Sequence, residues 1–239
     1  MGIAPRSAPR REKARAATIE EIKRTAVALM REHGTADLKF ADIARAMDMT
    51  APALYRYFAD RDALLSDLIA DAYNDLGDAV AKARDALPAD DVGGRFLAVA
   101  QSYRRWAREE PQQFALILGL PIKGYTAPED GPTTEAAQRA MSQLSALFVQ
   151  ALAAGRLAPP RVREVHPSLV ACAELKSHDL PVAIPADTFQ AMLQAWSALH
   201  GFVSLEAYGH FAWIDEAGRD ALFESHARLT AQNAGLPLD

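Results

Sequence analysis

Hydrophobic residues recur at helical spacing along almost the whole chain, and the first such run lies between Thr18 and His33. Its apolar positions are Ile19, Ile22, Ala26, Leu29 and Met30. Thr18 and Glu21 have the spacing of a capping box, and Gly34 is the residue type that ends a helix in the left-handed conformation. The pattern therefore predicts a helix of about 15 residues.

Two short helices follow. The first is predicted over Ala41 to Met47, with Ile43 and Ala44 among its apolar residues, and a turn from Asp48 to Thr50 comes next. Thr50 can cap the second helix, and Pro52 in its first turn removes an N–H that would have had no helical partner. In that helix Leu54 and Phe58 point inward at i, i+4, which leaves Tyr55, Arg56 and, more obliquely, Tyr57 on another face. This arrangement is typical of a helix-turn-helix.

The rest of the chain continues the helical pattern. Asp60 caps a long helix that ends near Leu87 and Pro88, and further helices are predicted over Val92–Glu109, Gln112–Leu118, Thr134–Ala154, Pro167–Lys176, Asp187–Tyr208 and Glu216–Asn233. The only candidate strand is Pro181 to Pro185, which its flanking prolines disfavour. The segment from Gly119 to Pro132 holds three glycines and three prolines, so we predict a long, mobile loop. The fold class is therefore all-α.

Charge is distributed unevenly. The whole chain carries -5, but residues 1–60 hold 11 Lys and Arg against 8 Asp and Glu, and the remainder holds 15 against 23. This asymmetry predicts that the N-terminal part meets a polyanion. Residues 1–15 hold five basic residues against one acid, with two prolines, and are expected to form a flexible arm. Two readings of the arm remain open: a solvated tail, or an arm that touches DNA phosphates or the minor groove.

Several classes of protein are disfavoured by what the sequence lacks. No apolar run has the length of about 18 residues that a membrane span needs, and the basic N-terminus has no apolar segment of a secretory signal after it, so a cytoplasmic protein is expected. The single cysteine, Cys172, excludes an intramolecular disulfide and is expected to be buried packing. The histidines form no compact metal-ligand array, and His200 is interpreted as a hydrogen-bonded packing residue. No nucleophile elbow, P-loop or dinucleotide fingerprint is present, so neither enzymatic activity nor a cofactor is predicted.

The segment Phe40 to Leu65, FADIARAMDMTAPALYRYFADRDALL, resembles the signature of the TetR family of tetracycline-repressor-like regulators. The resemblance implies an all-helical dimer that binds a palindromic operator and releases it when a small molecule enters the C-terminal domain. It places phosphate contacts on Thr50, Tyr55, Tyr57 and Arg61, and base-reading positions on Ala51, Pro52, Ala53 and Arg56.

Two positions depart from the family pattern. Lys39 stands where many members have a capping Thr, and a lysine there can reach a phosphate instead of capping the helix. Asp48 stands where the turn usually has Gly, and aspartate tolerates a left-handed backbone better than most residues.

The C-terminal part is less specific. The segment Ala195 to Phe211 resembles the Trp-x-x-x-His-Gly segment of one subgroup of TetR-type C-terminal domains, which does not identify the ligand. An apolar or aromatic small molecule is predicted, because ligand pockets are mostly apolar with a few polar groups. The candidate pocket residues are Tyr73, Phe96, Tyr103, Trp106, Phe114, Met141, Phe148, Cys172, His178 and Trp196, most of which are also ordinary core residues. Asn74, Gln143 and His178 are the candidates for its polar groups.

The last two helices are candidates for a dimer interface. The helix from Asp187 to Tyr208 is apolar over much of its circumference and must be covered on both sides. The candidate interface residues are Ser197, Gly201, Phe202, Ser204, Leu205, Leu222, Ser225 and Leu229. The alternative is that the same residues pack only within one subunit.

The sequence thus predicts a basic arm at 1–15, a three-helix helix-turn-helix domain at 16–62, and a larger ligand-binding and dimerisation domain at 63–239. The predicted function is a ligand-responsive transcriptional repressor that binds double-stranded DNA as a homodimer. The alternatives are an activator, a regulator without ligand, and a small-molecule-binding helical protein that has lost DNA binding.

Overall fold

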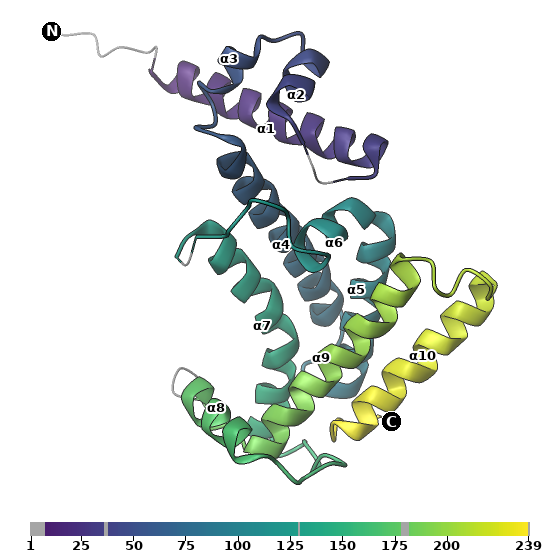
Figure 1. The fold of residues 1–239 in the computed structure, drawn as a ribbon. Coiled ribbons are helices and arrows are strands. Elements are labelled where there is room, and N and C mark those ends of the chain that lie inside the picture. The colour runs from purple at the N-terminus through teal and green to yellow at the C-terminus, as the bar shows by residue number, and fades with distance from the viewer. Residues whose placement is uncertain (1–7, 36–37, 129, 178–181, 239) are drawn as a thin grey trace, which may run out of the picture. The chain divides into compact units, whose positions relative to one another are not determined.

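The computed structural model describes residues 8–35, 38–128, 130–177 and 182–238, and within these ranges it contains helices and no strand (Figure 1). The helices are α1 (Ala8–His33), α2 (Phe40–Ala46), α3 (Ala51–Leu54), α4 (Arg61–Asp85), α5 (Val92–Glu109), α6 (Pro111–Leu118), α7 (Pro132–Ala153), α8 (Pro167–Ser177), α9 (Ala186–Ala207) and α10 (Glu216–Asn233). The all-α prediction is confirmed. No helix in the described part of the chain is both long and apolar enough to pass through a membrane.

The chain forms two compact units that interleave along the sequence. The first contains residues 1–73 and 110–137, and the second contains residues 74–109 and 138–239. Helix α4 supplies its first half to one unit and its second half to the other, and α7 is divided in the same way. The first unit therefore contains more of the chain than the predicted helix-turn-helix segment: it also holds the start of α4, all of α6 and the loop after α6.

The core of the first unit is built on one face of α1. Ile22, Ala26 and Met30 are fully buried at i, i+4 and i+8, as the periodicity predicts. They pack in one cluster with buried residues of the next three helices, of the segment between α3 and α4, and of α6: Phe40, Ile43, Ala44, Leu54, Phe58, Leu64, Leu65, Leu68, Ile69 and Leu116. These contacts hold the two short helices against α1. The packing is needed for their stability, because isolated helices of four to seven residues are unstable in water.

The start of α1 differs from the prediction. The helix begins at Ala8, so most of the predicted arm is helical from that residue onward, and residues 1–7 lie outside the described residues. Thr18 is inside the helix, where its hydroxyl donates to the carbonyl oxygen of Ala14, and it caps nothing. The physical reason is that the segment from Arg10 to Ala17 consists of Arg, Lys, Glu and Ala, which are strong helix formers. The C-terminal end is as predicted, with Gly34 at φ +66°.

The loop after α6 runs from Gly119 to the start of α7 and is not helical in its described residues, as predicted. It is not free of the fold, because Ile122 and Tyr125 pack on the core of the first unit. The Tyr125 hydroxyl lies 3.0 Å from the Ser66 hydroxyl on α4. The candidate strand is not found: residues 182–185 have no strand structure, and Pro181 lies outside the described residues.

The second unit is organised around α5, α9 and α10, which pack on one another. Phe96 and Phe148 meet edge to face with their ring centroids 6.5 Å apart, and Phe223 of α10 is fully buried. The predicted bounds of α5 and α10 are confirmed to the residue. Cys172 is exposed on α8, which contradicts the expectation that it is buried. The reason is that α8 buries only Ala173 and so presents most of its apolar residues to solvent.

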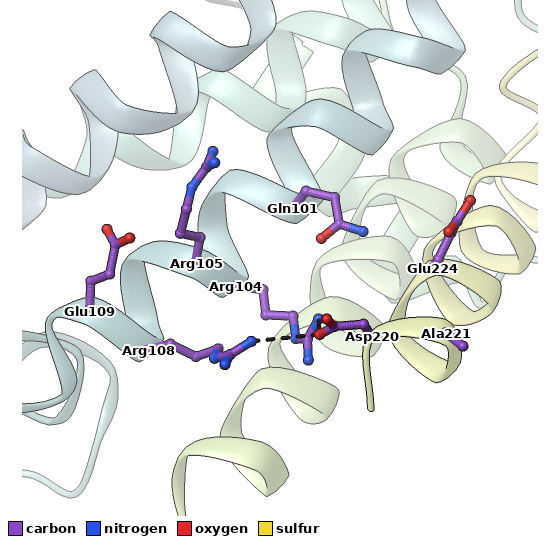
Figure 2. Close-up of a pocket in the computed structure, with 8 residues that line it drawn as sticks. All are labelled: Gln101, Arg104, Arg105, Arg108, Glu109, Asp220, Ala221 and Glu224. Carbon is purple, nitrogen blue, oxygen red and sulfur yellow. Dashed lines mark ion pairs between the residues drawn. The ribbon is translucent and has the colours of Figure 1, made fainter. Parts of the chain in front are cut away.

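A buried arginine ties these three helices together. Arg104 of α5 donates to both carboxylate oxygens of Glu206 on α9, at 2.7 and 2.6 Å, and lies 2.8 Å from Asp220 on α10. Its guanidinium carbon is also 5.0 Å from the ring centroid of Phe223. The hydrogen bonds to Glu206 raise the pKa of Arg104, so the guanidinium stays charged. Figure 2 shows Arg104 and Arg108 directed from α5 toward Asp220.

Arg104→Met should destabilise the protein by about 3 kcal/mol, because it removes both short hydrogen bonds to the buried carboxylate of Glu206 and leaves it only the longer ion pair with Arg219, at 3.6 Å. Urea unfolding would measure the change. Arg108→Met is the matched control: Arg108 is half exposed and paired with the exposed Glu216, so its loss should cost less than about 1 kcal/mol. Equal effects of the two substitutions would contradict the structural role assigned to the buried pair.

Candidate nucleic-acid interface and effector cavity

The turn between α2 and α3 has the geometry that the sequence predicts. Asp48 adopts φ 51°, the left-handed conformation, and the Met49 N–H donates to the carbonyl oxygen of Ala44 at 2.8 Å. Pro52 lies in the first turn of α3, as predicted, and Leu54 and Phe58 are buried beneath the helix. The turn therefore survives the replacement of glycine by Asp48.

The capping role predicted for Thr50 is only partly correct. Thr50 occupies the N-cap position with extended backbone angles, but its side chain makes no capping hydrogen bond. The Ala53 N–H donates instead to the backbone carbonyl of Thr50, at 2.8 Å, so the backbone closes the turn without the hydroxyl. Lys39, at the N-cap of α2, likewise makes no side-chain cap, as its residue type predicts. Both side chains are exposed.

The outer surface of α3 and its following turn is polar and aromatic. Tyr55 is 56% exposed although its ring packs 5.0 Å from that of Phe40, and Pro52 and Arg56 are exposed. Ala51, Ala53 and Tyr57 are half-buried. Tyrosine hydroxyls and arginine donate to phosphates and base edges, and alanine and proline can contact thymine methyl groups. Most of the predicted base-reading and phosphate-contacting residues thus lie on α3 and the turn that follows it, and each of these is exposed or half-buried.

Arg61 has a structural contact that sequence reasoning missed. Its Nε donates to the carbonyl oxygen of Leu38 at 2.9 Å, which joins the start of α4 to the segment before α2. The start of α4 is also capped as predicted, because the Asp60 carboxylate accepts from the Ala63 N–H at 2.8 Å. The phosphate contact implied for Arg61 stays a prediction, and any substitution there also removes this backbone contact.

An apolar cavity of about 40 Å³ lies in the second unit. It is lined by Leu76, Val80, Val99, Ala100, Tyr103, Ala140, Met141, Gln143, Leu144, Trp196 and Leu199. Three predicted pocket residues, Tyr103, Met141 and Trp196, are brought together here, and so is Gln143, a predicted polar group. Gln143 is held by Arg84, whose Nη1 donates to its Oε1 at 2.6 Å.

The other candidate pocket residues lie elsewhere. Phe96, Trp106 and Phe148 are buried in the second unit without lining the cavity; Trp106 donates to Asp75 at 2.8 Å. Tyr73 and Phe114 belong to the first unit, where the Tyr73 hydroxyl donates to the carbonyl oxygen of Ile117. Cys172 is exposed, and His178 lies outside the described residues. Helical spacing therefore predicted that most of these aromatic residues are buried, but it identified only some of those that line the cavity.

A hydrogen-bonded chain borders the cavity at Tyr103. The Tyr103 hydroxyl lies 2.8 Å from Nδ1 of His200, and Nε2 of His200 lies 3.3 Å from the Ser204 hydroxyl. The Trp196 ring stacks on His200 with centroids 5.3 Å apart and an interplanar angle of 13°. The interpretation of His200 as a hydrogen-bonded packing residue is confirmed. Burial lowers the pKa of His200, so the ring is neutral at pH 7.

The second unit also has an open, charged groove of about 790 Å³ between α5 and α10. Figure 2 shows its lining residues: Gln101, Arg104, Arg105, Arg108, Glu109, Asp220, Ala221 and Glu224. Basic and acidic side chains are balanced there, and Arg104 and Arg108 already pair with carboxylates. The groove therefore has no net charge that would select a ligand. In the described part of the chain, no group of three His, Cys, Asp or Glu side chains is placed to hold a metal ion.

The outward surface of α9 and α10 carries most of the candidate interface residues. Leu205, Leu222 and Leu229 are 43 to 50% exposed, Ser197 and Ser225 are exposed, and a Cβ added at Gly201 would meet no atom within 4 Å. Phe202 is placed differently: it is 7% exposed and packs 5.0 Å from Phe223 and 5.1 Å from Phe211. It is therefore part of the core between α9 and α10 rather than of the exposed surface, because an aromatic ring there fills the space between the two helices.

The fold and the exposed surface of α3 define a helix-turn-helix DNA-binding regulator. Comparison with known proteins identifies the family. Residues 22–68 match the model of the bacterial regulatory proteins of the tetR family, and residues 96–230 match the model of the tetracyclin repressor-like C-terminal domain. The chain belongs to the TetR family of transcriptional regulators, as its helix-turn-helix signature predicts, and members of this family are DNA-binding regulators rather than enzymes. Membership of the Trp-x-x-x-His-Gly subgroup stays a prediction.

Individual relatives agree with this assignment. The chain is 33% identical over 203 residues to the HTH-type transcriptional regulators Rv1816 of Mycobacterium tuberculosis and Mb1846 of Mycobacterium bovis, covering 83% of this chain and 84% of theirs. Among solved structures, a protein described as regulatory, SCO4313, matches with a TM-score of 0.70 at 33% identity over 96% of this chain and 100% of its own. A Rhodococcus protein of unknown function shares the fold at a TM-score of 0.65 and 21% identity, over 90% of this chain and 95% of its own.

The depressed pKa of His200 has a consequence for stability. Below pH 6.5 the unfolded state takes up a proton at this ring before the folded state does, so stability should fall as the pH is lowered from about 7.5 to 5.5. Urea unfolding at several pH values should show a shallower fall for His200→Asn than for the natural chain. His210→Asn, at an exposed histidine, is the control and should keep the full pH dependence. An unchanged slope in His200→Asn would show that other groups cause the acid destabilisation.

Proposed function

We propose that this protein is a homodimeric repressor that binds a palindromic operator and is released by a small, neutral, apolar or aromatic molecule. Each protomer inserts α3 into the major groove of one half-site, and the two recognition helices are separated by about 34 to 36 Å, one turn of B-DNA. The effector enters the apolar cavity and favours a conformation with another separation.

The observation that carries the proposal is the course of α4. Its first turns place Leu64, Leu65 and Leu68 in the core beneath the recognition helix, and further along the same helix Leu76 and Val80 line the cavity. A change in the cavity walls can therefore act on the helix that supports α3. The effector needs only to bind the released conformation better, and a tenfold loss of operator affinity takes about 1.4 kcal/mol of such preference.

The character of the cavity supports a neutral effector. Its lining contains no Asp, Glu, Lys or Arg side chain, and its polar groups are the Tyr103 hydroxyl, the Gln143 amide and the Trp196 indole N–H. A charged molecule would lose its hydration there without finding an opposite charge, which costs far more than the burial of an apolar group. The exposed leucines and the small residues Ser197 and Gly201 on α9 and α10 support dimerisation, because they offer an apolar surface that another helix can approach closely.

The purified protein should select specific fragments from genomic DNA, and the selected fragments should share a palindrome. Their affinity should fall roughly 10³- to 10⁵-fold between about 50 and 200 mM salt if about 6 to 10 phosphates are contacted. A mobility-shift titration at several salt concentrations measures this. The absence of any salt-dependent shift would refute operator binding, and a reporter gene behind the selected site distinguishes repression from activation.

Ala100→Leu should make operator binding insensitive to effector. Ala100 is fully buried at the cavity wall, and the larger side chain fills a space of about 40 Å³. The variant is compared with the natural chain using a compound found by screening apolar and aromatic molecules for operator release. Unchanged operator affinity in the variant shows that it is folded, and normal release by the compound would refute the cavity as the effector site.

Leu205→Glu should convert the dimer to monomers and weaken operator binding at least tenfold, because it places a charge in an apolar interface. Sedimentation equilibrium measures the molecular mass. Leu175→Glu on α8 is the matched control, since Leu175 is 69% exposed and lies outside the proposed interface. A dimer that survives Leu205→Glu would contradict the proposed interface.

A further inference from the structure

Helix α1 extends beyond the part of the chain that matches the family model. The tetR family model begins to match at residue 22, whereas α1 begins at Ala8. The first turns of this additional segment, residues 8–17, carry four exposed basic residues, Arg10, Arg11, Lys13 and Arg15, and a single acidic one, Glu12. None of Arg10, Arg11 and Lys13 forms an ion pair within the described residues, so their charge is not neutralised by this part of the protein.

Arg15 fixes this extension to the end of the recognition helix. Its Nη1 donates to the carbonyl oxygen of Arg56 at 2.7 Å, and its Nη2 donates to that of Tyr57 at 3.4 Å. The guanidinium carbon also lies 5.2 Å from the ring centroid of Tyr57. Both carbonyls lie in the turn that follows α3, and Arg15 supplies hydrogen-bond donors to these two backbone acceptors. The contact therefore holds the N-terminal turns of α1 beside the surface that faces DNA.

Helical geometry determines which of the other basic residues shares the side of Arg15. At about 100° per residue, Arg11 lies within about 40° of Arg15 and about 6 Å further along the axis. Lys13 lies about 160° away, on the opposite side of α1. Arg11 is thus carried past the end of α3 on the same side as Arg15, and Lys13 is directed away from it.

We propose that the N-terminal extension of α1 is a second DNA-contacting element. In it, Arg11 contacts a backbone phosphate that flanks the bases read by α3, and Arg15 is the positioning residue that holds the extension against the recognition helix. This inference rests on the proposed operator binding, because it requires DNA to lie along α3. The partner is the duplex backbone, so the contact adds affinity without adding base preference.

The test compares Arg11→Ala with Lys13→Ala in the full-length protein, because each removes one positive charge from the same exposed segment. Binding is measured by fluorescence anisotropy from about 50 to 200 mM salt, with a duplex of about 40 base pairs carrying the selected site and with one of random sequence. Arg11→Ala should reduce the magnitude of the salt slope by about one and weaken binding to both duplexes about five- to tenfold near 0.1 M salt. Lys13→Ala should change the slope by less than half as much.

Arg15→Lys tests whether Arg15 acts by holding the extension of α1 in place or only through its positive charge. The lysine keeps the positive charge, but a single ammonium cannot reproduce the fork that joins two carbonyls. In the Arg15→Lys background, Arg11→Ala should therefore weaken binding less than twofold, since the extension is no longer held in place. If Arg15 only stabilised the domain, its replacement would lower the thermal midpoint and leave the full effect of Arg11→Ala.

The outcomes distinguish this inference from the proposed function. Similar slopes for Arg11→Ala and Lys13→Ala, with normal binding by the natural chain, would overturn the inference and leave operator binding intact. A change in the selected sequence caused by Arg11→Ala would also overturn it, because a phosphate contact carries no base preference. Failure of the natural chain to bind either duplex would refute the proposed function and this inference together.

Discussion

The structure depends on the continuity of α4. This helix runs without interruption from Arg61 to Asp85, and its start is held by the Asp60 cap and by the contact of Arg61 with the carbonyl oxygen of Leu38. The same helix carries Leu64, which packs in the core of the first unit, and Leu76, which lines the cavity of the second unit. Interrupting such a helix costs several backbone hydrogen bonds, and the proposed release of DNA by an effector depends on this continuity.

The sequence predicted the helices well where periodicity and end signals agree. The bounds of α5 and α10 are correct to the residue, and α10 is capped by Asp215, which accepts from the Gly218 N–H at 2.7 Å. The start of α1 was misplaced because Thr18 and Glu21 have the spacing of a cap in a segment that was already helical. A capping signal is informative only where the preceding residues disfavour a helix, and the Arg, Lys, Glu and Ala residues before Thr18 favour one.

The sequence predicts those parts of the candidate site that depend only on residues close together in the chain. The turn at Asp48, the proline in α3 and the inward residues Leu54 and Phe58 follow from residue type and spacing, and the structure confirms them. The contacts of Arg15 and Arg61 were not predictable in this way, because each joins a side chain to a backbone carbonyl more than 20 residues away. The cavity is intermediate: helical spacing identified aromatic residues that are buried, but whether a buried ring lines a space or fills one depends on how the helices cross.

The size of the cavity limits how an effector can act. About 40 Å³ is far below the 300 Å³ or more that a pocket for a drug-sized molecule provides, so an effector of that size must displace side chains to enter. Met141 and Leu144 can move most readily, because both are only half-buried and Met141 is unbranched, whereas Tyr103 is held by its hydrogen bond to His200. Under the proposed function, opening the cavity on the α7 side is the step that an effector must stabilise. A ligand can shift the populations of two conformations only if it binds one of them more tightly. An effector that fits only the opened cavity would bind the open conformation more tightly, and this difference would drive the switch.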